Sequence, residues 1–374
     1  MLPQPMTRIL GFIPPDYSLQ PSLWQVSDRV SLTTGSSRLR FTSLTRMKTI
    51  SLFWPEPQKR RLFSAGICVA TLAILAPRLP AAEEKPAATP QPIQEGDGHH
   101  FACTDYTAGK VFIVNRDGKV EWDYATGRCN DLWVLPNGNL LFNTGHGVKE
   151  VTREKAVVFN YESSSEIYAC QRLANGNTFV GECNTGRLLE VAPDGKVVKE
   201  TRLLPPGQDG GHLYIRNARQ LANGNYLVAH YGQQVVREYD SQGRKVREIP
   251  APGGPHSVIR LSNGNTLIAC GDMPGGPRVF EVDTEGATVW EVKADELPGI
   301  RLKFMAGVQR LPNGNTVMSN WLGHGQLGKA PHLIEITRDK RVLWTFFDHQ
   351  TMNTVSSIQL LDVSGDATKG EVWH

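Results

Sequence analysis

The sequence predicts an all-β fold, a six-bladed β-propeller in which an N-terminal hairpin completes the C-terminal blade. Three observations lead to this prediction. A hairpin phrase built around Asn-Gly-Asn recurs along the chain, a second type of hairpin follows each copy, and the two series are offset by half a unit. No stretch shows a long apolar period of 3.6 residues, so we expect little helix.

The N-terminal part of the chain carries signals of export. The basic triplet Lys-Arg-Arg at 59–61 precedes an apolar run that begins at Leu62, and small residues follow up to Ala82. This order is typical of a secretory signal peptide, and the run is shorter than the roughly 20 apolar residues that a bilayer span needs. We therefore expect residues 47–82 to be a signal peptide. Residues 1–46 in front of it are interpreted as a mis-assigned start or a disordered extension.

The segment after the predicted cleavage site has the composition of a linker. Residues 83–98 are rich in Pro, Ala and Glu and contain almost no large apolar side chain, which is typical of a disordered connection. We expect residues 1–98 not to pack on the propeller, which then spans residues 99–374. The mature chain would be periplasmic or extracellular and would have no stable membrane span.

The blades are predicted from the repeated phrase. It reads LPNGNLLF at 135–142 and LSNGNTLI at 261–268, and its first Asn falls at 137, 175, 223, 263 and 313, in steps of 38, 48, 40 and 50 residues. Such a period indicates propeller blades. Asn-Gly between apolar runs also predicts a hairpin with a type I′ turn.

Ring closure is predicted from what lies outside the five copies. A second-type hairpin at 110–123 precedes the first copy, and a degenerate first-type hairpin at 355–373 follows the last one. The two together would make a sixth blade that leaves no open sheet edge. We therefore expect residues 110–124 and 355–373 to share one sheet.

Charge and cysteine content limit the other classes. The formal net charge of +3 comes from interspersed acids and bases, and nothing suggests the one-sided basic excess of a nucleic-acid-binding protein. Five cysteines remain after the signal peptide. Cys170 with Cys183, and Cys103 with Cys129, flank hairpins in a way that suits two disulfides and leaves Cys270 free. Buried reduced cysteines are an equal alternative.

Two phrases carry a resemblance to known families. PHSVIRLSNGNTLIAC at 255–270 and RVFEVDTEGATVWEV at 278–292 resemble six-bladed propellers of the NHL and arylsulfotransferase-like groups. The endings DGKVEW, EGATVW and DKRVLW resemble PQQ-like repeats. The PQQ cofactor is not expected, because PQQ-dependent dehydrogenases have eight blades and adjacent cysteines, and this chain has no Cys-Cys pair.

The blade order of these families places a candidate ligand site at one mouth of the central channel. In that order, the strand before Asn-Gly lines the channel, and the segments entering it meet the ends of the next strands on one face. Polar and aromatic residues that converge on such a mouth are the usual form of a ligand site. The candidates are His146, Glu182, Arg216, His230, Tyr231, His256, Asp272 and His324.

Four of these candidates support a sharper hypothesis. We expect His230 and His256 to share a central polar pocket with Glu182 and Arg216, because all four come from neighbouring blades. His230, His256 and Glu182 are also the metal candidates. The ions to consider are Zn²⁺ and Ca²⁺, because some six-bladed lyases and lactonases bind one of them in the channel. The alternatives are exposed loop histidines at His146 and His324, and an Arg216–Glu182 ion pair.

Two functions fit the sequence. The first is an exported binding or scaffold propeller that takes a small molecule, a carbohydrate or a protein at the channel mouth and does not bind nucleic acid. The second is a channel-mouth enzyme, a hydrolase, lyase or arylsulfotransferase-like transferase, for which no nucleophile motif such as G-x-S-x-G is present.

Overall fold

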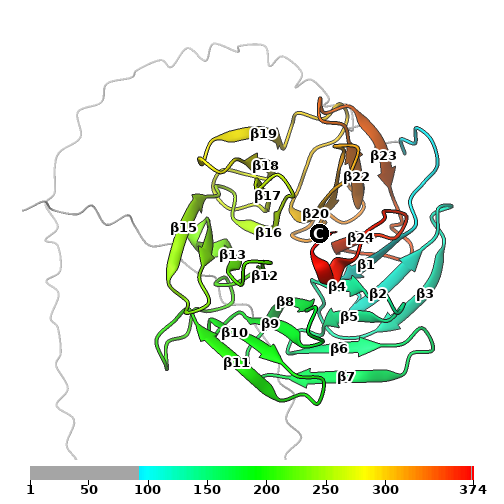
Figure 1. The fold of residues 1–374 in the computed structure, drawn as a ribbon. Coiled ribbons are helices and arrows are strands. Elements are labelled where there is room, and N and C mark those ends of the chain that lie inside the picture. Colours follow the sequence, from blue (N-terminus) through cyan, green and yellow to red (C-terminus); the bar gives the residue numbers. More distant parts are fainter. Residues whose placement is uncertain (1–91, 372) are drawn as a thin grey trace, which may run out of the picture. The chain divides into compact units, whose positions relative to one another are not determined.

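The chain folds into a ring of six antiparallel four-stranded blades, described here from a computed structural model for residues 92–371 and 373–374. Figure 1 looks along the ring axis and shows the blades following one another around the centre. The helical content of the described residues is two short 3₁₀ helices, η1 (Tyr231–Gln233) and η2 (Ala367–Lys369). The predicted all-β, six-bladed fold is confirmed. The predicted extension and signal peptide lie outside the described residues.

Each blade has one strand of each of four classes, from the axis outward. The innermost strands are β4 (Leu132–Val134), β8 (Ile167–Arg172), β12 (Asn217–Gln220), β16 (Pro255–Arg260), β20 (Met305–Arg310) and β24 (Val355–Leu360). The second strands are β1 (Phe101–Asp105), β5 (Leu140–Asn143), β9 (Thr178–Glu182), β13 (Tyr226–His230), β17 (Thr266–Cys270) and β21 (Thr316–Asn320).

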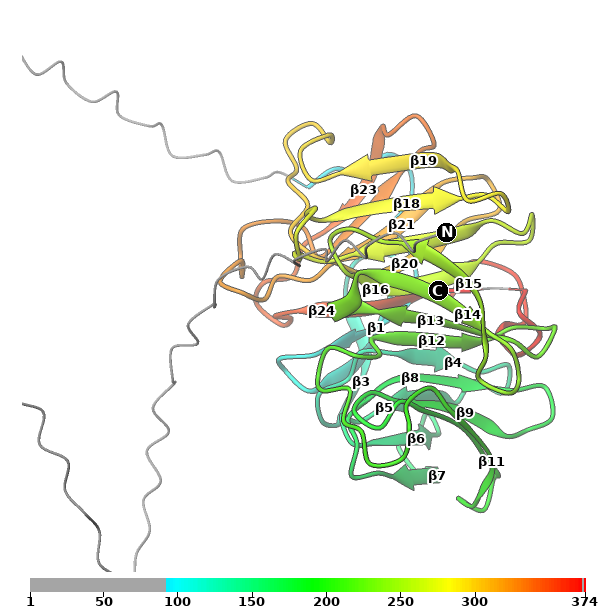
Figure 2. The same ribbon diagram turned by 90° about the vertical axis from the view of Figure 1, so that its left-hand side faces the viewer.

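The remaining two classes complete the blades. The third strands are β2 (Lys110–Val114), β6 (Gly147–Val151), β10 (Arg187–Val191), β14 (Val235–Tyr239), β18 (Arg278–Val282) and β22 (Leu333–Ile336). The outer strands are β3 (Val120–Ala125), β7 (Val157–Glu162), β11 (Val197–Arg202), β15 (Lys245–Pro250), β19 (Thr288–Lys293) and β23 (Val342–Phe346). In the side view of Figure 2 the strands near the axis run roughly along it, so their two ends lie on opposite faces of the ring.

The Asn-Gly hairpins use a different turn from the predicted one. At the first copy the amide of Gly138 donates to Leu135 O (2.8 Å) and the amide of Leu135 donates to Asn139 O (2.8 Å). Only Gly138 has a positive φ, 84°, which is a type I turn followed by a glycine bulge rather than type I′. Asn137 is needed for its side chain, because its Oδ1 accepts the amide of Asn139 (3.0 Å).

A repeated clamp joins neighbouring blades beside these turns. The last Asn of the phrase donates to a Glu of the third strand, and an Arg that ends the next innermost strand pairs with the same Glu. In one copy Asn265 Nδ2 lies 2.7 Å from Glu281 Oε1, and Arg310 Nη2 lies 3.1 Å from Glu281 Oε2. The same arrangement joins Asn139, Glu150 and Arg172, and joins Asn225, Glu238 and Arg260.

The ring closes by joining both ends of the propeller in one sheet, with the order β24-β1-β2-β3. Residues 110–124 and the C-terminal strand therefore share a blade, as predicted. The division differs from the expected two hairpins, because β24 alone comes from the C-terminal side and β1 takes the second position, with Phe101 opposite Leu360. Burial explains the choice: all five side chains of β1 are buried.

The residues after β24 cover the far end of the channel. Trp373 packs on two core clusters, and His374 is buried with its ring 4.3 Å from that of Trp133. Arg219 Nη2 donates to His374 O (2.8 Å) and forms a buried ion pair with Asp131. In Figure 1 this C-terminal segment, drawn in red, lies at the centre of the ring. The channel is thus occupied at the face opposite the candidate site.

Three further observations concern the ends and the cysteines. Ile93 and Glu95 form backbone hydrogen bonds with β23, so the expectation that no residue up to 98 packs on the propeller is wrong for this stretch. The cysteines of the propeller form no disulfide and are all buried, which favours the reduced alternative over two disulfides; they are Cys103, Cys129, Cys170, Cys183 and Cys270. The described residues include no helix long and apolar enough to cross a membrane.

Candidate functional site

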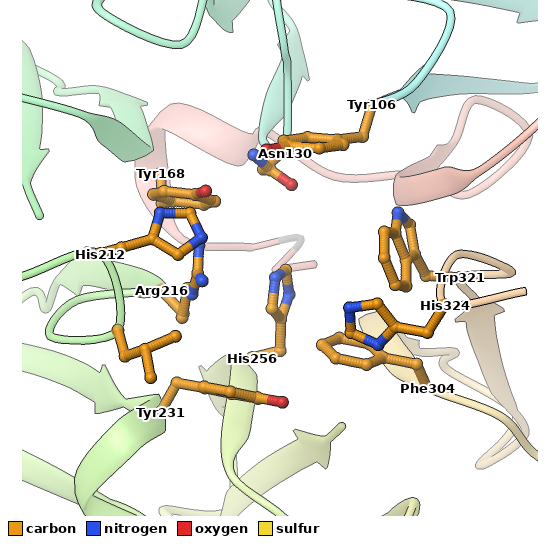
Figure 3. Close-up of a pocket in the computed structure, with 11 residues that line it drawn as sticks. Tyr106, Asn130, Tyr168, His212, Arg216, Tyr231, His256, Phe304, Trp321 and His324 are labelled. Atoms are coloured by element: carbon orange, nitrogen blue, oxygen red, sulfur yellow. The ribbon is translucent and has the colours of Figure 1, made fainter. Parts of the chain in front are cut away.

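A pocket of about 290 Å³ opens on the channel mouth where the innermost strands begin. All six blades contribute to it, either just before or at the start of an innermost strand or just after a second strand. Figure 3 shows its polar and aromatic side chains facing a common space. The lining residues are Tyr106, Asn130, Tyr168, His212, Leu213, Arg216, Tyr231, His256, Phe304, Trp321 and His324.

Arg216 is a buried cation in this pocket. It directly precedes β12 and is only 8% exposed. Its guanidinium carbon lies 4.2 Å from the ring centre of Tyr168 and 5.6 Å from that of Tyr231. Within the described part of the chain the guanidinium has no hydrogen-bond or carboxylate partner, and its Nε is enclosed without one. Buried charges in proteins are normally paired, so an unpaired guanidinium that borders a pocket is typical of an anion-binding site.

His256 lies beside Arg216 at the start of β16 and is 7% exposed. Its ring centre is 5.1 Å from that of Phe304, and its Nδ1 lies 2.9 Å from the carbonyl oxygen of Ala306. Burial first, and then the nearby charge of Arg216, lower the pKa of His256 to about 3. The imidazole is therefore neutral at physiological pH, and Nε2 is left to face the pocket.

A hydrogen-bonded group of three side chains forms one wall. Asp272 accepts a hydrogen bond from the hydroxyl of Tyr231 (2.8 Å) and pairs with Nδ1 of His324 (2.7 Å). Burial, with the hydrogen bond and charge of Asp272, raises the pKa of Tyr231 well above its usual range. His324 adopts a φ of 50°, uncommon for a residue with a side chain, and its ring stands 4.9 Å from that of Trp321.

A capping side chain fixes the aromatic part of this wall. Asn320, the last residue of β21, accepts hydrogen bonds through Oδ1 from the amides of Lys303 (2.8 Å) and Phe304 (3.3 Å). Its Nδ2 donates to Pro331 O (3.2 Å). The segment entering β20 is thereby held against the end of β21, which places Phe304 and Trp321 with ring centres 5.1 Å apart.

The eight predicted residues are distributed unevenly around the pocket. Arg216, Tyr231, His256 and His324 line it, and Asp272 holds two of them from behind. His146 is exposed and lines a small neighbouring cavity of about 50 Å³ together with Arg128.

Glu182 and His230 do not share the pocket, so that part of the hypothesis is wrong. Glu182 is fully buried and pairs with Arg187 (2.6 Å), not with Arg216. His230 is also fully buried, with Nδ1 3.0 Å from Tyr214 O and Nε2 2.9 Å from the Tyr239 hydroxyl. Each residue is the last one of the second strand of its blade, and its side chain is buried inside the blade instead of facing the channel. Since alternate residues face opposite sides, it is the following residue, Tyr231, that reaches the pocket.

The positions of these residues also contradict the predicted metal site formed by His230, His256 and Glu182. His256 is in the pocket while Glu182 and His230 are engaged inside their blades, so the three side chains do not converge. Over residues 92–371 and 373–374, no three His, Cys, Asp or Glu side chains are grouped as a metal site would need. The residues therefore do not fit a Zn²⁺ or Ca²⁺ site at this mouth.

A sequence signal existed for much of the pocket. Asn130, Tyr168, Arg216 and His256 each stand seven residues before the first Asn of their turn phrase, which falls at 137, 175, 223 and 263. These four positions line the same pocket. Tyr106 and Phe304 had no such signal, because Tyr106 follows the strand that closes the ring and Phe304 stands nine residues before its Asn.

Solved structures with a similar fold include proteins of known and unknown activity. A protein of unknown function from Bacteroides caccae is 29% identical, over 70% of this chain and 98% of its own, with a TM-score of 0.63. A streptogramin B lyase is 15% identical over 70% of this chain and 84% of its own, with a TM-score of 0.48. A virginiamycin B lyase from Staphylococcus aureus is 16% identical over 68% and 83%, with a TM-score of 0.47.

Sequence comparison identifies the family. No curated protein matches this chain. The model of one family, described as Mal s 1 allergenic protein-like, matches residues 106–337, which is more than half of the 374 residues. The match includes four complete blades, three of the four strands of the fifth blade, and all the residues that line the pocket. The chain belongs to the Mal s 1 allergenic protein-like family.

Proposed function

We propose that this propeller binds a small aromatic anion in the pocket at the channel mouth. The observation that carries the proposal is Arg216, a cation more than nine-tenths buried that has no anionic partner in the described chain and faces an open pocket. An anion that enters would complete this ion pair away from bulk water. Charge-assisted pairs of guanidinium with carboxylate or phosphate are among the stronger polar contacts in proteins.

The remainder of the pocket favours a ligand that contains an aromatic ring. Tyr168, Tyr231, Phe304 and Trp321 supply aromatic faces and edges around the space that Arg216 borders. Aromatic side chains contribute both apolar area and specific stacking geometry. A ring that carries an acidic group would use the walls and the cation together.

The charges around the mouth also favour an anion. The two acidic residues there are already engaged, Glu166 with His212 and Asp272 with His324. Two basic residues nearby, Arg128 and Lys303, form no ion pair within the described residues. Such uncompensated cations raise the local concentration of anions and speed their association.

Calorimetric titration with simple aromatic probes tests this proposal. We expect wild-type protein to bind benzoate and phenyl phosphate but not neutral benzamide, and Arg216→Met to lose at least about 100-fold in affinity, since breaking a buried ion pair costs roughly 3 kcal/mol or more. The control is Arg128→Met at the exposed rim, where we expect a loss of no more than about threefold. Equal binding of benzoate and benzamide, or unchanged affinity in Arg216→Met, would refute the proposal.

Catalysis at the same mouth is the second candidate. The observation in its favour is the unprotonated Nε2 of His256 beside Arg216, since general bases must be unprotonated and within reach of the substrate. Release of 4-nitrophenolate from 4-nitrophenyl sulfate and 4-nitrophenyl acetate would be followed for the wild type and His256→Gln. Turnover that disappears in the variant supports a transferase or hydrolase, and its absence in the wild type leaves binding as the better-supported function.

We also propose that the protein is exported and acts in the periplasm or outside the cell. The support is the sequence around residues 59–82, with its basic, apolar and small-residue segments in that order. Protein recovered from the exported fraction should begin near Glu83. Detection of residues 1–46 on the mature protein would overturn this proposal.

The wider relationship of the family and the remaining partners are proposals of the same kind. The phrases at 255–270 and 278–292 support a relationship to NHL, PQQ-like and arylsulfotransferase-like repeats. A carbohydrate or protein partner would have to use the rim of the pocket, and we expect no binding to nucleic acid. Electrophoretic mobility of a DNA fragment with increasing protein tests the last point, and a shift that weakens with salt would contradict it.

A further inference from the structure

His256 is a buried polar side chain that lines the pocket beside Arg216. Three aromatic rings stand around it, those of Phe304 at 5.1 Å, Tyr231 at 6.4 Å and Tyr168 at 6.5 Å. Its position is fixed by the hydrogen bond of Nδ1 to Ala306 O, which ties β16 to β20 of the next blade. The ring therefore cannot turn to offer a different atom without losing this inter-blade contact.

The contact also fixes the tautomer. A carbonyl oxygen only accepts hydrogen bonds, so Nδ1 must carry the proton. In the neutral ring Nε2 then holds a lone pair, and this atom has no hydrogen-bond partner among the described residues and borders the pocket. Figure 3 shows the His256 ring directed into the space between Arg216 and Phe304.

The surroundings of His256 disfavour a metal ion, a proton or a hydrogen-bond acceptor as the partner of the Nε2 lone pair. A metal cation would lie beside the charge of Arg216 and would find no second and third ligand in the described chain. Protonation by a bound anion would have to raise the pKa of His256 from about 3 to about 7, a ~10,000-fold change in proton affinity. A ligand oxygen that only accepts hydrogen bonds would face a lone pair, which leaves both atoms unsatisfied.

We infer that the ligand is a hydroxylated aromatic acid, whose carboxylate pairs with Arg216 and whose neighbouring hydroxyl donates a hydrogen bond to His256 Nε2. This inference rests on the proposed binding of an aromatic anion and adds the second group that the ligand carries. A hydroxyl on the carbon next to the carboxylate suits the two protein groups, because Arg216 and His256 are adjacent in the pocket.

Mandelate and phenylacetate form a matched pair of probes, since they differ only in that hydroxyl. In calorimetric titrations we expect one mandelate enantiomer to bind the wild type about tenfold more tightly than phenylacetate, the ratio that one net hydrogen bond provides. The ratio should fall to about one in His256→Phe, because the lone pair that accepts the hydroxyl is lost. His256→Gln, which can place an acceptor near the position of Nε2, should retain part of the preference.

The outcomes separate the two proposals. Equal binding of both acids by the wild type, with both lost in Arg216→Met, would overturn the hydroxyl requirement and leave the anion site intact. A preference for mandelate that persists in His256→Phe would also overturn it. Failure of the wild type to bind either acid would overturn both proposals, and thermal melts of each variant identify any loss of fold.

Discussion

Replacing Glu281 by Gln tests whether the clamps beside the Asn-Gly turns hold the blades together. Glu281 belongs to β18, its side chain is 2% exposed, and it accepts from Asn265 and from Arg310 and Arg338 of the next blade. Burial raises the pKa of this carboxyl, but the hydrogen bonds of Arg338 and Asn265 outweigh burial and lower it overall. The acid is therefore ionised in the folded protein at neutral pH.

The size of the effect follows from what the substitution leaves behind. Glutamine keeps an acceptor for Asn265 but removes the charge opposite Arg310, whose side chain is 10% exposed. Leaving one partner of a buried pair uncompensated costs roughly 3–5 kcal/mol, and the retained hydrogen bond places Glu281→Gln at the lower end, ~3 kcal/mol. For a domain of roughly 280 residues, with an unfolding entropy of about 2.1 cal/mol/K per residue, this lowers Tm by about 5 °C.

Differential scanning calorimetry of the wild type and two variants measures this difference. The control is Glu285→Gln, a change of the same chemistry at an exposed position in the β18–β19 turn, for which we expect a change in Tm within about 2 °C. A Tm for Glu281→Gln within 2 °C of the wild type would refute the idea that the clamp stabilises the ring. An equal loss in the control would attribute the effect to net charge instead.

Three further predictions concern closure, pH and the site. Asp105→Ala should lower the free energy of unfolding by roughly 3 kcal/mol in urea denaturation, because its buried carboxylate accepts the amides of residues 107, 108, 353 and 354 across the closing blade; a loss below 1 kcal/mol contradicts this. Burial lowers the pKa of His99 and raises that of Glu335, but their mutual hydrogen bond reverses both shifts overall. Their pairing should therefore stabilise the fold most between pH 4.5 and 6.5 and progressively less as pH rises through the raised pKa of His99, so the stability difference between wild type and His99→Gln should shrink above pH 7. Arg216→Met should leave Tm unchanged or higher, because lost cation–π contacts of about 2 kcal/mol are offset by the removed desolvation cost; a clear fall in Tm would show that Arg216 is structural.

The blade architecture was predictable because each repeat of the sequence contains the same hairpin phrases. The Asn-Gly phrase fixes the hairpins, and the extra units at both ends predict that the chain closes on itself. The turn type was not predictable from Asn-Gly alone, since Asn137 acts through its side chain rather than through a positive φ. The sequence did not predict that β1, rather than a strand from residues 361–373, would be the second strand of the closing blade. That choice depends on the burial of residues 101–105 in the folded ring.

The site was predictable in its location and only partly in its members. The sequence places Arg216 and His256 on the correct face because both precede or begin an innermost strand. It misplaced Glu182 and His230, since a one-residue step at a strand end moves a side chain from the pocket into the blade. The sequence also did not predict that Glu182 would form its ion pair with Arg187, which leaves Arg216 without a carboxylate partner among the described residues.

A crystal structure with 4-bromobenzoate tests the central claim most directly, because anomalous scattering locates the bromine and thus the direction of the ring. The account predicts the carboxylate on the guanidinium of Arg216 and the ring among Tyr168, Tyr231 and Phe304 at the channel mouth. A probe found only elsewhere on the propeller, or one whose carboxylate points away from Arg216 to the solvent, would contradict it.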